Sequence, residues 1–508
     1  MKLPYINPIR MQRKQIGTFM GLDRRIITQE NAFTDMENIS LEDYPAMGVR
    51  KPRGEIIKTL SKPNGLFWKN GLAYVDGTSF YYKDAKKGDV SNTEKNMVGM
   101  GAYILIFPDK KYFNTHTGEF GTMEKTWTQG AQATFTPTYA ASVYTKISCT
   151  GIGKNFNEKD GVTISGCTNA AFNGTFIIEG KTNDSITVIS TLEKQFTQAS
   201  GLKLTRTIPD MDFIVENENR LWGCSNAKHE VYASKLGDPM NFNVFEGIST
   251  DSYAATIGSD GNFTGAASSQ GYVVFFKEDK IHKVQGNKPS NIQITSQEAM
   301  GVKEGCADSL CSINGTLYYV APEGVCAYTG GVPYLISELL GNKVSSGMAG
   351  TFKGNYYLFA GEILVYSPER RIWTREESMD VKFLAGGEGE LYIIDSENRL
   401  FTLEGNRTEK IFWYLESGDQ EEGSLQKKFI QKLQFYLELE QGSQADILIQ
   451  YDNSPMWEHL YSVTAKEKRV YTVPVIPRRC SRYRYRIEGM GRAKLLGIGK
   501  YTREGSEI

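Results

Sequence analysis

A two-strand unit that recurs along the chain constrains the fold more than any other feature of the sequence. Each copy consists of an apolar strand rich in aromatic residues, a short polar turn and a second strand. Seven copies can be read, and they begin at Leu66, Ala102, Asp212, Gly271, Gly315, Gly354 and Gly389. Their turns are made of Asn, Asp, Glu, Gly and Pro, which provide turn geometry and keep charge exposed. Because one hairpin cannot bury both of its faces, the copies must pack against one another.

Repeated hairpins of this kind are typical of a β-propeller, in which each copy is one blade. The composition agrees, because aromatic residues favour strands and make up 12% of the 508 residues, with 28 Tyr among them. We therefore predict an all-β fold with a β-propeller over residues 61–128 and 208–415. A β-sandwich or a solenoid built from similar hairpins is the alternative.

The long interval between the second and third copies predicts an inserted domain. The segment 129–207 contains six short alternating strands, among them TKISCTG, GVTISGC and SITVIS. Six such strands suffice for a small β-sandwich or barrel, and loop tips tolerate insertions. The Thr-rich outer faces of this domain are either a binding surface or simply a solvated one.

The two ends of the chain differ from the repeats. A polar linker, ESGDQEEGSLQKK, is followed by alternating segments such as KLQFYLELEQ and ADILIQYD, which predict a C-terminal β-sandwich domain at 424–508. The first residues are polar, punctuated by Pro and basic at their start. This composition predicts an extended N-terminal arm over residues 1–60 that orders against something else.

The sequence contains no arrangement that is typical of an active site. It has no HExxH, GxSxG or Walker motif, and its four His residues lie in separate segments. The seven Cys residues are scattered without a CxxC pair, which predicts buried free thiols. We therefore expect no catalytic residue, no cofactor and no metal, and a protein that is not an enzyme. A carboxylate pair for glycan hydrolysis stays open, because a sequence does not show the distance between two carboxyl groups.

The charge balance and the hydropathy exclude other classes of protein. The chain has 58 Lys and Arg against 59 Asp and Glu, a net charge of −1, which excludes a strongly basic DNA-coating protein and a strongly acidic one. No stretch approaches the ~18 to 20 apolar residues that a membrane helix needs. The basic N-terminal residues are not followed by the apolar segment of a signal peptide. These features predict a protein made in the cytoplasm.

One basic segment stands out near the C-terminus. Its candidate residues are Arg478, Arg479, Arg482, Arg484, Arg486 and Arg492. Three of them alternate with Tyr483, Tyr485 and Ile487, so a strand would present three guanidinium groups on one face. Such a face can contact a nucleic-acid backbone, dock on an acidic neighbouring subunit, or pair within its own chain. We take these residues as candidates for subunit or DNA contact.

Three segments resemble tail nozzle and packaged-DNA stabilisation proteins of short-tailed bacteriophages. The first lies near the N-terminus and matches the family at Phe19, Gly21, Asn38, Tyr44, Pro45 and Arg50, whereas Met20 stands where the family has Gly. The second is the most specific, and it matches at Arg220, Leu221, Trp222, Val231, Tyr232, Ser234, Gly237, Asp238, Pro239, Asn241 and Phe242. The third is the Arg-rich strand that closes on IEGMGRAKLLGIGKY.

The resemblance implies a structural virion protein of a phage tail, made in the host cytoplasm and located in the virion. Its expected partners are further copies of itself in a hexameric ring, the portal-adaptor and other tail proteins, and packaged double-stranded DNA in transient contact. Such a ring forms a nozzle or tail-tube segment that retains the DNA and conducts it at ejection. The alternative is a tail protein that binds or degrades a host-surface carbohydrate, with a host surface glycan as its partner. An ordinary cytoplasmic scaffold propeller is a third hypothesis, but it does not account for the matched segments.

Overall fold

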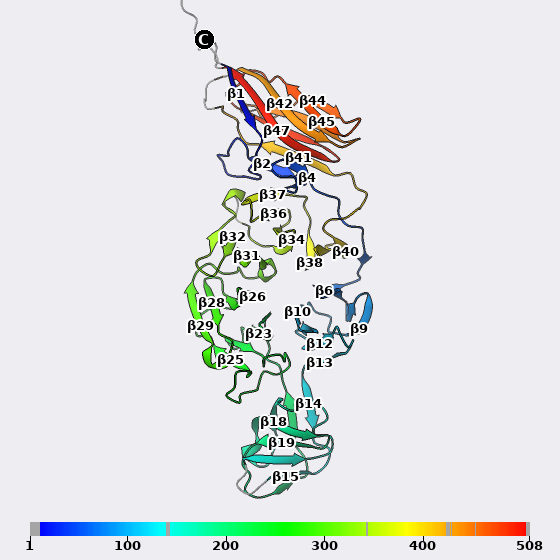
Figure 1. Ribbon diagram of the computed structural model, residues 1–508, viewed down its shortest axis with the longest axis vertical. Coiled ribbons are helices and arrows are strands. Elements are labelled where there is room, and N and C mark those ends of the chain that lie inside the picture. Colours follow the sequence, from blue (N-terminus) through cyan, green and yellow to red (C-terminus); the bar gives the residue numbers. More distant parts are fainter. Residues whose placement is uncertain are drawn as a thin grey trace, which may run out of the picture. The chain divides into compact units, whose positions relative to one another are not determined.

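The computed structural model describes residues 11–138, 143–341, 344–422, 427, 429–452 and 454–503. The chain divides into two compact units, which are described separately below. Unit 1 consists of Met1–Thr59 and Asp308–Ile508, and unit 2 is Leu60–Ala307. The described secondary structure is made of β-strands and four short 3₁₀ helices (Figure 1). The predicted all-β class is therefore confirmed.

Unit 2 contains four antiparallel sheets of four strands, each paired in chain order. Their strands are β6 (Pro63–Trp68), β7 (Leu72–Asp76), β8 (Ser79–Tyr82), β9 (Ala85–Asp89); β10 (Asn96–Met100), β11 (Tyr103–Phe107), β12 (Lys111–Asn114), β13 (Phe120–Thr122); β22 (Phe213–Asn217), β23 (Arg220–Ser225), β24 (Glu230–Ala233), β25 (Tyr253–Thr256); and β26 (Gly265–Ser269), β27 (Tyr272–Phe276), β28 (Lys280–Gln285), β29 (Gln293–Glu298). A 3₁₀ helix, η2 (Pro289–Asn291), lies between β28 and β29.

Unit 1 contains three more sheets of the same kind, the last of which takes its fourth strand from the N-terminal part of the chain. Their strands are β30 (Cys311–Ile313), β31 (Thr316–Ala321), β32 (Gly324–Tyr328), β33 (Tyr334–Leu335); β34 (Met348–Phe352), β35 (Asn355–Phe359), β36 (Ile363–Ser367), β37 (Ile372–Arg375); and β38 (Val381–Gly387), β39 (Glu390–Asp395), β40 (Arg399–Thr402), β5 (Lys58–Thr59). Two 3₁₀ helices, η3 (Ala307–Ser309) and η4 (Glu338–Leu340), flank the first of these sheets.

The seven predicted hairpins each fall in a separate four-stranded sheet among the described residues. Within unit 2, β6 lies beside β10, β10 beside β22, and β22 beside β26; within unit 1, β30 lies beside β34 and β34 beside β38. First strands that adjoin from sheet to sheet are the arrangement of propeller blades. The sheets are therefore propeller-type blades, and the hairpins seen in the sequence are parts of them.

The turn between the first two strands of these blades explains why the hairpins form. Asn314 and Gly315 have φ of 50° and 78°, and Lys353 and Gly354 have φ of 48° and 74°. Two consecutive residues with positive φ make a type I′ turn, whose twist matches that of paired antiparallel strands. Gly takes the second position because it adopts this conformation without a steric penalty.

The insertion folds as one eight-stranded antiparallel sheet in unit 2. Its strand order is β14-β21-β17-β18-β19-β16-β15-β20. The elements are β14 (Lys125–Thr128), β15 (Ala133–Pro137), β16 (Tyr144–Ser148), β17 (Gly161–Ser165), η1 (Ala170–Phe172), β18 (Gly174–Thr182), β19 (Ser185–Ile189), β20 (Phe196–Gln198) and β21 (Lys203–Arg206). Strands from both ends of this sheet contribute to a single apolar core, which includes Trp127, Phe135 and Leu204. The sheet is therefore folded around its own core.

The C-terminal part of unit 1 is a β-sandwich. One sheet has the order β3-β4-β47-β42-β45 with β1 also paired to β47, and the other has the order β2-β41-β46-β43-β44. Their strands are β1 (Met11–Ile16), β2 (Phe33–Glu37), β3 (Ile39–Ser40), β4 (Met47–Val49), β41 (Phe412–Ser417), β42 (Phe429–Leu439), β43 (Gln444–Tyr451), β44 (Glu458–Thr464), β45 (Arg469–Val475), β46 (Tyr483–Met490) and β47 (Ala493–Arg503). The sheets meet face to face where the rings of Phe435 and Tyr485 pack edge-on, with centroids 5.4 Å apart.

The structure differs from the predicted extended arm at 1–60. Residues 11–59 supply β1 to β5, which pair with β47, β41 and β40, whereas residues 1–10 lie outside the described part. Phe19, Leu22 and Phe33 are fully buried in unit 1. Because these strands are only two to six residues long and lie between polar stretches, their apolar residues did not form a readable alternation. The sandwich also takes β41 from a segment that the prediction placed at the end of the propeller and in the linker.

Candidate functional site

The predicted Arg-rich strand is β46, at the middle of the five-stranded sheet of the sandwich. Tyr483, Tyr485 and Ile487 are buried, while Arg484 and Arg486 are half-buried on the opposite face. The predicted alternation is therefore present, because successive side chains of a strand point to opposite sides. Arg482 lies immediately before the strand.

The guanidinium groups of this strand are paired within the chain. Arg482 Nη1 lies 3.1 Å from Asp419 Oδ2, and Arg484 bonds the carboxylate of Glu416. Arg486 Nε lies 2.7 Å from Glu488 Oε2. Of the three interpretations of the segment, the structure shows pairing within the chain. Contact of these residues with a neighbouring subunit or with DNA stays a prediction.

The other candidate arginines are not part of this face. Arg478 is exposed, and its Nη2 lies 2.8 Å from Glu458 Oε1. Arg479 is exposed beside it on the connection between β45 and β46. Arg492 lies in the turn after β46, where its backbone N–H donates to Ser443 Oγ at 3.0 Å. The six arginines therefore do not converge on one site.

Two histidines lie beside hydroxyl groups, but neither grouping has the geometry of a catalytic triad. His459 Nε2 lies 2.8 Å from Ser462 Oγ and 3.4 Å from Asp446 Oδ1, and the Ser462 hydroxyl bonds that same carboxylate. A triad needs the two partners on different ring nitrogens, so no proton relay runs through this ring. His282 is buried between Ser259 and Ser296, and burial lowers its pKa to about 4.

A pocket of about 430 Å³ lies among the first turns of the three blades of unit 1. The residues that line it include Ser312, Asn314, Thr351, Lys353, Gly389 and Glu390. They come from the β30–β31, β34–β35 and β38–β39 hairpins, which the adjoining first strands bring together. The turns leave hydroxyl, amide and backbone groups around one cavity.

Glu390 carries the chemistry of this pocket. Its Oε2 atom is buried, and no described residue donates a hydrogen bond to it. A carboxylate oxygen removed from water without a donor is costly, so the arrangement favours a ligand that brings O–H or N–H groups. Lys353 does not neutralise it, because its Nζ lies 2.6 Å from Glu404 Oε2 instead. This pocket was not predicted from the sequence. Its rim is formed by the repeated hairpin turns in which a Gly is the second residue.

The residues of the middle resemblance segment have structural contacts. Arg220 is buried, and its Nη1 donates to the carbonyl oxygens of Ser234 and Asp251 at 2.7 and 2.5 Å. Asn241 Nδ2 donates to Asp160 Oδ1 at 3.1 Å, and Arg206 Nη1 donates to Asp160 Oδ2 at 2.8 Å. The Asn241–Asp160 bond joins the loop after β24 to the inserted domain. The contacts of these signature residues therefore maintain local structure within unit 2.

The described residues have three further properties that bear on function. They contain no group of three or more His, Cys, Asp or Glu side chains placed to hold a metal ion. The seven cysteines are free thiols, and six of them are buried. No described helix is long and apolar enough to span a membrane.

No protein-family model and no curated protein sequence matches the chain. Among solved structures, the computationally designed Ika8 protein is 11% identical with a TM-score of 0.35, over 69% of this chain and 100% of that one. BamB from Moraxella catarrhalis is 10% identical with a TM-score of 0.34, over 72% and 99%. The endosialidase of phage phi92 is 10% identical with a TM-score of 0.25, over 79% and 70%. At such low scores, none of these likenesses supports an inference about function.

Proposed function

We propose that this chain is a structural virion protein of a bacteriophage tail that assembles with further copies into a hexameric ring below the portal-adaptor. The ring retains packaged double-stranded DNA and conducts it at ejection. The three sequence segments that resemble tail nozzle proteins support this function. The near-neutral charge is compatible with it, because a strongly basic lumen would hold DNA by its phosphates.

The observation that carries the proposal is the distribution of exposed apolar side chains in unit 1. Those on its sandwich and its N-terminal segment are Met20, Ile26, Ile27, Ile56, Ile57, Phe412, Phe429, Met456, Tyr461, Val470 and Ile476. Single exposed apolar residues are ordinary, whereas adjoining ones are typical of a protein–protein interface, and Ile26 adjoins Ile27 as Ile56 adjoins Ile57. In the proposed ring, these side chains pack against neighbouring subunits.

Light scattering of the purified full chain at several concentrations tests the assembly. We expect a discrete particle near six times the chain mass of 56.9 kDa. Negative-stain images of that particle are expected to show a ring with a central channel. A monomer at every concentration up to the solubility limit would contradict the proposal.

A second candidate function is carbohydrate binding or degradation at the host surface, and the Glu390 pocket favours it. Sugar hydroxyls are the donors that its unpaired carboxylate oxygen lacks, and the pocket volume of about 430 Å³ is in the range of small-ligand sites. A glycan array probed with the labelled chain tests this function. We expect at least ~10-fold weaker glycan binding for Glu390→Gln, since a buried acceptor is lost.

The matched control for that experiment is Glu369→Gln, because the side chain of Glu369 is 81% exposed. It should bind like the wild type. Signals at background level for the wild type, or equal binding by the wild type and Glu390→Gln, would exclude the pocket as a glycan site.

A further inference from the structure

The six-stranded sheet of the sandwich carries two cations on either side of one aromatic ring. Strands β1, β47 and β42 run side by side in this sheet (Figure 1). Tyr501 on the middle strand β47 lies opposite Arg13 on β1 and opposite Lys432 on β42. The Arg13 Cζ atom lies 5.7 Å from the centroid of the Tyr501 ring, and Lys432 Nζ lies 4.7 Å from it. The three side chains therefore share one face of the sheet.

This face points away from the core of the sandwich. Successive side chains of β42 alternate between the two faces of the sheet. Phe435 is buried against Tyr485 of the other sheet, whereas its neighbours Gln434 and Tyr436 are half-buried on the opposite side. We call this outer surface the Tyr501 face. It consists of Arg13, Gln15, Lys432, Gln434, Tyr436, Gly499 and Tyr501.

The positive charge of the Tyr501 face is not neutralised within the described part of the chain. Neither Arg13 nor Lys432 forms an ion pair with a described residue, and their closest contact of this kind is the Tyr501 ring. Lys14, which follows Arg13 on the other face of β1, differs because its Nζ lies 2.8 Å from Glu30 Oε2. The Tyr501 face contains no Asp or Glu. It therefore presents two uncompensated cations to its surroundings.

Gly499 leaves the centre of the Tyr501 face without a side chain. Packing within the chain does not require glycine there, because Gly499 has no positive φ and the nearest atoms to an added Cβ, in Gln434 and Tyr501, lie 3.6 Å away. At Gly497 on the same strand, by contrast, a Cβ would lie 2.9 Å from the Ile16 carbonyl oxygen. A glycine inside a strand often marks a place where a ligand approaches closely. The open centre at Gly499 is such a place.

The side chains of the Tyr501 face match the chemistry of phosphate. Arg, Lys, Gln and Tyr side chains all donate hydrogen bonds to phosphate oxygens of DNA. Arg13 and Lys432 lie on strands separated by one other strand, which places the strands about 10 Å apart. Because each DNA strand carries a phosphate for every ~3.4 Å of helix axis, both cations can contact one DNA strand at once.

We propose that the Tyr501 face contacts the phosphate backbone of double-stranded DNA. This inference rests on the proposed function, in which a ring of these chains retains packaged DNA. Phosphate contacts carry no base-sequence information, so the face binds DNA of any sequence. Two cations in each copy give a weak contact that salt reduces further, which suits DNA that is first retained and then released.

Anisotropy of a fluorescein-labelled DNA duplex, titrated with the full chain at several salt concentrations, tests the contact. Arg13→Gln with Lys432→Gln should weaken binding at least ~10-fold at low salt. It should also lower the slope of log K against log [salt] by about 2, because each lost phosphate contact removes about 0.9. Gly499→Glu, which places a carboxylate between the two cations, should weaken binding by at least as much. Thermal unfolding of these surface variants should match that of the wild type.

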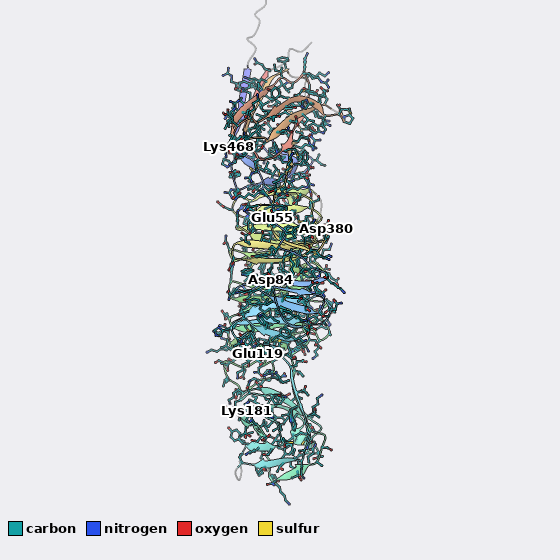
Figure 2. All side chains as sticks on the ribbon, turned by 90° about the vertical axis from the view of Figure 1, so that its right-hand side faces the viewer. Glu55, Asp84, Glu119, Lys181, Asp380 and Lys468 are labelled. Atoms are coloured by element: carbon teal, nitrogen blue, oxygen red, sulfur yellow. The ribbon has the colours of Figure 1, made fainter. Side chains whose placement is uncertain are left out.

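The matched control also removes two positive charges from the sandwich, but charges that are already paired. Lys468, labelled in Figure 2, has its Nζ 2.5 Å from Glu440 Oε1, and Arg469 Nη1 lies 3.2 Å from Glu467 Oε1. Lys468→Gln with Arg469→Gln should therefore bind DNA like the wild type. Equal weakening by the two double variants would assign binding to net charge and overturn the contact.

The contact is also overturned if the wild type does not bind the duplex, or if Arg13→Gln with Lys432→Gln binds it unchanged. Light scattering of the same samples keeps this failure separate from that of the proposed function. A ring that fails the DNA tests would overturn the contact and leave the assembly in place. Monomers at every concentration would overturn the ring, and with it the inference that rests on it.

Discussion

Arg53 shows how strongly one residue can fix the N-terminal segment to unit 1. Its side chain is 2% exposed, and Nη2 lies 2.7 Å from Glu376 Oε2, whose side chain is 4% exposed. Nε also lies 2.9 Å from Glu377 Oε1, and Nη1 donates to the Leu403 carbonyl at 3.1 Å. The neighbouring carboxylates raise the pKa of Arg53 against the opposing effect of burial, so the guanidinium stays charged.

Arg53→Met should therefore lower the free energy of unfolding by about 3 to 5 kcal/mol, because it leaves the buried Glu376 carboxylate unpaired. Denaturant unfolding followed by tryptophan fluorescence measures this. Arg469→Met is the matched control, since Arg469 is 61% exposed and pairs with an exposed carboxylate. It should cost less than about 1 kcal/mol. Equal effects of the two variants would show that burial of the Arg53 pair contributes nothing.

His282 makes a pH-dependent contribution to stability. Burial, and next the nearby positive charge of Lys277, lower its pKa from 6.5 to about 4. The unfolded chain binds a proton near pH 6.5, whereas the folded chain does not until about pH 4, so stability falls as the pH drops through this window. His282→Gln should remove a loss of about 3 kcal/mol between these limits. The exposed His116 is the control, and His116→Gln should leave the pH profile of unfolding unchanged.

At the scale of elements, the type I′ turns separate two reasons why a Gly cannot be replaced: a positive φ, and a lack of room for a Cβ. Gly389 has φ of 79° with nothing within 4 Å of an added Cβ, while Gly386 has no positive φ and its nearest atom lies at 3.9 Å. Gly389→Ala should destabilise by about 1 to 2 kcal/mol through its backbone alone. Gly386→Ala should be neutral or slightly stabilising, because it restricts the unfolded chain. Thermal unfolding of both variants measures the difference, and equal midpoints would contradict it.

Local pattern predicted the hairpins well because turn residues and apolar strands lie within one short stretch, as in Gly354 to Trp373. It also predicted the alternation of Arg484 and Arg486 with buried residues. The pairing of Arg484 with Glu416 was not predictable, since Glu416 lies on a strand that is distant in sequence and adjacent only in the sheet. The Glu390 pocket was missed for the same reason, because three separate turns form it.

At the scale of the whole chain, the sandwich depends on residues that the sequence placed in an arm. Deleting residues 1–40 removes β1, β2 and β3, so that β41 loses its neighbour β2 and β47 loses its partner β1. We expect this truncation to lower the unfolding temperature by at least ~10 °C or to make the protein insoluble. Differential scanning fluorimetry and solubility measure the effect. The full chain with Ile26→Ser and Ile27→Ser, which alters only an exposed loop of the same segment, should unfold like the wild type.

The pairing of β2 with β41 also has a consequence for synthesis. Thr34 Oγ1 donates to the carbonyl of Glu416, 382 residues later in the sequence. At ~5 to 20 residues per second, the early strand leaves the ribosome tens of seconds before its partner exists. Nascent chains must therefore keep Phe33 and Met36 from premature association, and prematurely terminated chains never complete the sandwich. The sandwich is therefore complete only after synthesis has passed β47, the last of its strands.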